Sequence, residues 1–162
     1  YRMQNRTYRY LEEEPLYPFG YGLSYTQFFY SHLKISQDEL STAEDKSIRV
    51  SVQVENVGDL AGDEVVQMYV TDVEASTTVP QWELRGFKRV RLNPGEKAKV
   101  EFELTKRQLA LIDEDGRCIL EPGTFRLYIG GQQPDSRSRK LTGQDVLQAE
   151  FVVTGEPMEL EY

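Results

Sequence analysis

A strict alternation of apolar and polar side chains is the feature that most limits what this chain can fold into. Between positions 48 and 54 isoleucine or valine occupies every second position, and polar residues occupy the positions between them. Similar alternation returns over 98–104 and 125–129. Because successive side chains of a β-strand point to opposite faces, each run describes a strand with one face in a core and the other in water. The run 65–73 is partly apolar on both faces, which is typical of a central strand.

Turn-forming residues separate these runs. Asn93–Glu96 and Glu121–Thr124 each place proline and then glycine at the two central positions, which is the pattern of a type II turn. Asp115 and Gly116 predict a tight hairpin turn. Short strands separated by frequent turns predict an all-β fold, an antiparallel sandwich or barrel. The strands are expected near residues 28–36, 47–56, 64–73, 84–92, 97–104, 117–120, 124–130 and 146–154.

One stretch has helical spacing. Thr105–Ile112 is expected to make a single helical turn, with Leu109 and Ile112 facing the core. No other helix is expected, because no other segment between the predicted strands has a long helical pattern of apolar residues.

The N-terminal segment, residues 1–27, differs from the rest in its density of tyrosine and phenylalanine. Prolines and glycines at 15–22 exclude a regular helix or a central strand there. Many aromatic rings exposed to water would form an adhesive patch, so the segment is expected to pack across the sandwich or against another domain. We therefore divide the chain into a linker or docking segment (1–27), a β-sandwich (28–155) and a C-terminal tail (156–162).

The charge of the chain argues against a nucleic-acid partner, and the absence of a long apolar run argues against a membrane span. The formal net charge is −8, and an acidic surface repels the phosphate backbone of a nucleic acid. The basic cluster Arg137, Arg139 and Lys140 is expected to lie in an exposed loop rather than in a phosphate site. The chain has no run of about 18 apolar residues, so no membrane-spanning helix is predicted. The chain has neither an initiator methionine nor a signal-peptide pattern, which suggests a fragment of a longer protein.

No catalytic set, cofactor motif or metal site is predicted. His32 is the single histidine and is expected on a strand surface, and Asp113–Gly116 is expected at a hairpin tip rather than in a calcium loop. Cys118 is the single cysteine, so no internal disulfide can form; a bacterial cytoplasmic setting is favoured over export, and the compartment stays open. Trp82, with tyrosines near it, has two interpretations: it stacks on sugar rings, or it serves domain packing.

Several motifs follow one another in the order of a known family. The N-terminal segment carries Arg6–Leu11 and then Pro15–Thr26, which reads PLYPFGYGLSYT. The later matches are Val54–Gly58, Gly62–Val70, Glu83–Phe87, Leu92–Glu96, Glu121–Phe125 and Gly130–Gly131. Together they cover nearly the whole chain, and the chain resembles the C-terminal domain of glycoside hydrolase family 3. It departs from the family at Trp82, at Gln132 and Gln133, and in a longer 137–145 stretch.

The resemblance implies a fibronectin type III-like or immunoglobulin-like antiparallel sandwich. It also implies that the parent enzyme is a retaining β-glycosidase, most simply a β-glucosidase, with both catalytic carboxylates in an upstream barrel domain and an upstream α/β domain. On this hypothesis the chain contributes no catalytic residue and meets β-linked sugars only through its parent. The N-terminal residues expected to dock against the upstream domains are Tyr8, Arg9, Tyr10, Tyr17, Phe19 and Tyr21.

Two other functions stay open at this point. The chain could be a carbohydrate-binding module that uses Trp82 and surface tyrosines as a stacking platform. It could also be a stand-alone interaction domain of immunoglobulin type.

Overall fold

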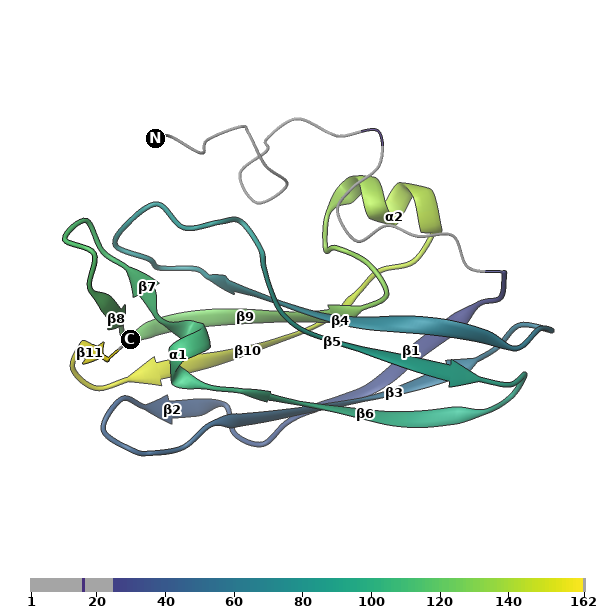
Figure 1. Cartoon of the computed structure of the whole chain (residues 1–162), viewed down its shortest axis with the longest axis horizontal. Helices are drawn as coiled ribbons and strands as arrows, with labels where there is room; N and C mark the ends of the chain where they lie inside the picture. The colour runs from purple at the N-terminus through teal and green to yellow at the C-terminus, as the bar shows by residue number, and fades with distance from the viewer. Residues whose placement is uncertain (1–15, 17–24, 162) are drawn as a thin grey trace.

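Two sheets packed face to face form the body of the molecule (Figure 1). The structure is a computed structural model, and it describes residue 16 and residues 25–161. The three-stranded sheet has the order β1-β3-β6 and the five-stranded sheet the order β2-β10-β9-β4-β5. A small third sheet, β11-β8-β7, lies at one end of the sandwich (Figure 1). The all-β sandwich predicted from the alternation is confirmed.

The strands follow the sequence pattern closely. In the three-stranded sheet they are β1 (Phe28–Ile35), β3 (Ile48–Asn56) and β6 (Lys97–Leu104). In the five-stranded sheet they are β2 (Glu39–Ser41), β4 (Gly62–Asp72), β5 (Glu83–Leu92), β9 (Gly123–Gly130) and β10 (Leu147–Thr154). The small sheet holds β7 (Leu111–Ile112), β8 (Cys118–Leu120) and β11 (Met158–Leu160).

The core lies between the two large sheets. One face of β3 supplies Ile48, Val50, Val52 and Val54, each at most 1% exposed. β9, in the opposite sheet, supplies Phe125, Leu127 and Ile129. β4 lies between β9 and β5, which confirms it as a central strand. Burying each large apolar side chain contributes about 1.5–3 kcal/mol relative to leaving it in water, so the alternation is the main stabilising feature of the fold.

The structure corrects several details of the sequence prediction. The predicted helical turn is α1 (Lys106–Leu109), but Ile112 belongs to β7 and is 52% exposed, whereas Leu111 is buried. Strand alternation therefore replaces helical spacing there. A second helix, α2 (Ser136–Thr142), was not expected; it begins after the N-cap Asp135 and contains the basic cluster predicted to be a loop. The short strands β2 and β11 were also not predicted.

One strand pair departs from the antiparallel arrangement. β2 runs parallel to β10, with Glu39, Leu40 and Ser41 opposite Val152, Val153 and Thr154. Leu40 is fully buried, and this fixes the register of the short strand.

The two predicted type II turns have different outcomes. In Asn93–Glu96 the amide of Glu96 donates to the carbonyl of Asn93 at 3.0 Å, and Gly95 has a φ of 79°, as predicted. In Glu121–Thr124 the φ of Gly123 is 150°, and the amide of Thr124 donates instead to the Glu74 carboxylate at 2.7 Å. That prediction was wrong because a side chain from another loop supplies the acceptor that a turn would have supplied.

Candidate functional site

Asn56 forms a buried polar corner at the end of β3. Its side-chain Nδ2 donates to the carbonyls of Leu60 at 2.8 Å and Leu92 at 3.0 Å. Its Oδ1 accepts from the amide of Gly58 at 3.0 Å and from the hydroxyl of Thr26 at 2.9 Å. One amide thus ties the entry into β1, the loop before β4 and the end of β5 together. A Cβ on Gly58 would stand 2.9 Å from the backbone nitrogen of Gln27, which explains the glycine of the Val54–Gly58 motif.

The outer face of the five-stranded sheet carries a buried polar chain. Gln67 and Tyr69 alternate with core residues of β4, so they point away from the sandwich interior, yet both are buried. The Tyr69 hydroxyl donates to Gln67 Oε1 at 2.7 Å, and Gln67 Nε2 donates to the carbonyl of Gly131 at 3.2 Å. The segment that follows β9 therefore packs on this face, where Figure 1 also places α2.

A cleft of about 210 Å³ opens where that segment meets β1 and β4. Tyr30 and Glu64 line it from the strands, and Gly131 and Gln132 line it from the segment after β9. A Cβ on Gly131 would stand 2.7 Å from Glu64 Oε2, so only glycine lets the backbone pack against this carboxylate. Burial raises the pKa of Glu64. Burial, and secondarily the nearby Glu64 charge, raises the pKa of Tyr30 far above its usual range, so its hydroxyl keeps its proton.

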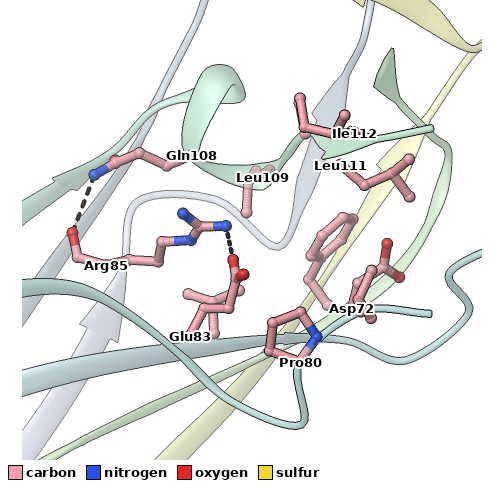
Figure 2. A pocket seen from close by; sticks show the side chains of 12 residues that line it. Asp72, Pro80, Glu83, Arg85, Gln108, Leu109, Leu111 and Ile112 are labelled. Atoms are coloured by element: carbon pink, nitrogen blue, oxygen red, sulfur yellow. Dashed lines mark hydrogen bonds and ion pairs between the residues drawn. The ribbon is translucent and has the colours of Figure 1, made fainter. Parts of the chain in front are cut away.

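A second cavity, of about 240 Å³, lies between the start of β5 and the α1–β7 segment (Figure 2). Glu83 and Arg85 form an ion pair inside it, and Gln108 Nε2 donates to the carbonyl of Arg85 at 3.0 Å. Gln108 is itself fixed by the capping box with Thr105 that begins α1. The volume is below the roughly 300–1,000 Å³ of usual small-molecule pockets. The Gln108 hydrogen bond holds α1 against β5. Arg85 neutralises Glu83, so Asp72 is the remaining acidic side chain in the cavity wall (Figure 2).

Asp72 is expected to destabilise the fold at neutral pH. Its pKa is raised by burial and secondarily by the negative charges of Glu121 and Glu74. With a raised folded-state pKa, stability falls as the pH rises through the ordinary aspartate pKa, and the loss is complete once the pH exceeds the folded-state pKa. Asp72→Asn should raise the melting temperature at pH 7 by roughly 2 °C, and the gain should disappear near pH 3, where aspartate is protonated in both states.

Differential scanning calorimetry across this pH range measures that effect. Asp38→Asn is the matched control, because Asp38 is exposed and its backbone carbonyl, which the substitution keeps, accepts from the amide of Val152. A lower melting temperature for Asp72→Asn at pH 7, or the same gain at both pH values, would contradict the expectation.

The structure describes the predicted stacking residue Trp82 but none of the predicted docking residues. Tyr8, Arg9, Tyr10, Tyr17, Phe19 and Tyr21 lie outside the described residues. Leu16, from the same segment, is described, and its carbonyl accepts from the Arg137 guanidinium on α2 at 3.3 and 3.4 Å. Trp82 is half-buried at the start of β5.

Tyr25 does not share a surface with Trp82. Tyr25 is 94% exposed, and its neighbour Thr26 meets Gly62, at the opposite end of the β4–β5 ladder from Glu83. Eight residues of strand separate Gly62 from Val70, the partner of Glu83, which is about 27 Å. The two aromatic side chains therefore do not form one stacking platform.

Within the described residues, no group of three or more histidine, cysteine, aspartate or glutamate side chains is placed to hold a metal ion. None of the helices in this part of the chain is long and apolar enough to cross a membrane.

Comparisons with known proteins agree with this architecture. Residues 64–133 match the model of a fibronectin type III-like domain. The chain is 44% identical over 128 residues to a putative β-xylosidase of Formosa agariphila and 45% identical over 132 residues to thermostable β-glucosidase B of Acetivibrio thermocellus. Both matches cover 79% of this chain and 17% of the relative.

Solved structures give the same result. β-Glucosidase 3B from Thermotoga neapolitana matches 92% of this chain with a TM-score of 0.75 and 35% identity, and the match takes 19% of that chain. A β-glucosidase from Listeria innocua matches 94% of this chain with a TM-score of 0.73 and 36% identity. This chain thus spans less than a fifth of the curated relatives that it matches. It carries a fibronectin type III-like domain of the kind found in glycoside hydrolase family 3 enzymes.

Proposed function

We propose that the chain is a non-catalytic accessory domain of a retaining β-glucosidase, which packs against and stabilises the catalytic domains of its parent. The observation that carries the proposal is the match itself: a whole sandwich that corresponds to a minor part of longer β-glucosidases and β-xylosidases. Retaining hydrolysis needs two carboxyl groups about 5 Å apart across the scissile bond. In the second cavity the Glu83 carboxylate is held in an ion pair with Arg85, which suits packing rather than hydrolysis.

The partners in this proposal are a barrel domain and an α/β domain that precede the sandwich in the parent chain. The docking surface would be the N-terminal segment with Tyr8, Arg9, Tyr10, Tyr17, Phe19 and Tyr21. The contact of Arg137 with the carbonyl of Leu16 supports this, because it ties that segment to α2 on the outer face of the five-stranded sheet. Aromatic and arginine side chains supply most of the binding energy in protein interfaces.

Purified residues 1–162 are expected to release no nitrophenol from aryl β-glucosides or aryl β-xylosides, because the proposal places both catalytic carboxylates in other domains. Removal of the domain from the intact parent enzyme should lower its melting temperature by several degrees, because an apolar interface would be exposed to water. Initial rates and thermal melts measure the two effects. Turnover by the isolated chain above the uncatalysed rate would overturn the proposal, as would an unchanged melting temperature of the truncated parent.

A further inference from the structure

The Glu64 carboxylate has no counter-charge among the described residues. It is half-buried in the cleft beside Tyr30, and the amide of Val65 donates to its Oε1 at 3.0 Å. No basic side chain acts on it among the residues that the structure describes. The adjacent Asp63, which is at the surface, is paired with both Arg89 and Arg91. Removing a carboxylate from water without a cation or several donors costs folding free energy. Unlike Asp63, Glu64 has no basic partner among the described residues to offset that cost.

The other polar groups around Glu64 bring no positive charge to it in the described part of the chain. The Tyr30 hydroxyl is buried beside the carboxylate and directs its proton toward it, but it carries no charge. The amide nitrogen of Gln132 is already used, because it donates to the carbonyl of Gln144 at 2.8 Å. Asp145 also lines the cleft, and its carboxylate is neutralised by Arg139. The part of the cleft that the structure describes therefore holds one carboxylate, Glu64, without a basic partner.

The wall of the cleft is built to leave that charge accessible. Gly131 packs against Glu64 with no side chain of its own, and a Cβ on Gly130 would stand 2.8 Å from Val146 Cγ1. Gly131 lets the chain pass close to the carboxylate without covering it, and Gly130 leaves room for Val146. The cleft is also lined by the apolar residues Phe28, Leu141 and Val146, which suit the methylene stem of a long basic side chain.

We propose that this cleft binds the guanidinium group of an arginine side chain from an adjoining domain, with Glu64 as the counter-charge and Tyr30 as a hydrogen-bonding partner. Arginine fits better than lysine, because its planar group can bond the carboxylate and a second oxygen at once. The cleft then forms a polar contact in the interface between domains. The source of the arginine rests on the proposed function, whereas the recognition of a guanidinium by the cleft does not.

The test is an NMR titration of residues 1–162 with Nα-acetyl-arginine amide. Nα-acetyl-citrulline amide is the matched probe, because it has nearly the same shape without the charge. Arginine should shift the backbone amides of Gly130, Gly131 and Gln144 with a dissociation constant on the order of millimolar, and citrulline should bind about tenfold more weakly. Glu64→Gln should weaken arginine binding about tenfold and Tyr30→Phe about threefold.

Two further variants keep the result interpretable. Glu101→Gln removes one charge from an exposed position on β6 and should leave arginine binding unchanged. Glu64→Asp keeps the charge and should bind arginine better than Glu64→Gln, which separates loss of charge from loss of packing. Equal binding of citrulline and arginine, unchanged binding by Glu64→Gln, or shifts confined to another surface would each overturn the site.

A last arm tests the source of the arginine. Replacement of Arg2, Arg6 and Arg9 together by glutamine should leave the affinity for free arginine unchanged if the natural occupant comes from another domain. A tighter affinity in that variant would overturn the assignment to an adjoining domain, because it would show that the chain's own N-terminal segment competes for the cleft. None of these measurements uses glycoside hydrolysis, so the site can fail while the accessory role stands.

Discussion

Asn56→Ala is expected to lower the free energy of unfolding by about 3–5 kcal/mol, the largest effect of any single substitution outside the apolar core. The side chain is fully buried and makes four hydrogen bonds to three separate segments. Alanine would leave the carbonyls of Leu60 and Leu92 and the amide of Gly58 without these partners. Each buried group left unsatisfied costs about 1–3 kcal/mol. Urea denaturation followed by circular dichroism measures the loss.

Two further variants serve as controls for Asn56→Ala. Asn93→Ala is the control, because Asn93 is exposed and makes a single side-chain bond, to Glu96 at 3.2 Å; it should cost at most about 0.5 kcal/mol. Asn56→Asp keeps the acceptor oxygen but presents a second oxygen to two carbonyls, so it should be about as damaging as alanine. An Asn56→Ala protein within about 1 kcal/mol of the original would show that the corner is not a structural centre.

Phe125→Ala is expected to lower the free energy of unfolding by about 3–5 kcal/mol. Phe125 and Phe151 stand opposite each other on β9 and β10, and their rings stack with centroids 5.5 Å apart and planes 7° apart. Both are almost fully buried, so removal of one ring leaves a cavity and an unpartnered aromatic face. Urea denaturation again measures the change, and Phe125→Leu should cost less, about 1–1.5 kcal/mol, because most of the volume is kept.

Phe29→Ala is the matched control for this second prediction. It makes the same chemical change on β1, at a side chain that is 56% exposed, and should alter stability by no more than about 0.5 kcal/mol. If Phe125→Ala and Phe29→Ala were equally mild, the β9–β10 ring pair would not be a centre of the core.

The parts of the fold that the sequence predicted are those that depend on local periodicity. The alternation over 48–54 identified one core face of β3 because strand geometry alone decides which side chains share a face. β2 and β11 were not predicted, because each is only three residues long and is defined by its hydrogen bonds to a partner strand. α2 lacks an apolar stripe, although Asp135 before it and Gly143 after it, with a φ of 70°, are the usual start and stop signals of a helix.

The clefts could not be predicted, because they join residues with no local relation in the sequence. Glu64 looks like one more polar residue at the start of a strand, and only the packing of Gly131 against it reveals a carboxylate set in a cleft. Asn56 is similar, since its motif was recognised from the family while its four hydrogen bonds depend on distant segments. The predicted docking residues have no structural test, because they lie outside the described part of the chain.

The parallel pairing of β2 with β10 sets the order in which the molecule can be completed. Residues 39–41 leave the ribosome early, but their strand partner, residues 152–154, is synthesised more than a hundred residues later. Until then β9 presents an open edge with free amides and carbonyls, which is a template for pairing with other chains. The sandwich therefore closes late, through contacts between its two ends, and any chain shortened before β10 would lose this closure and expose an aggregation-prone edge.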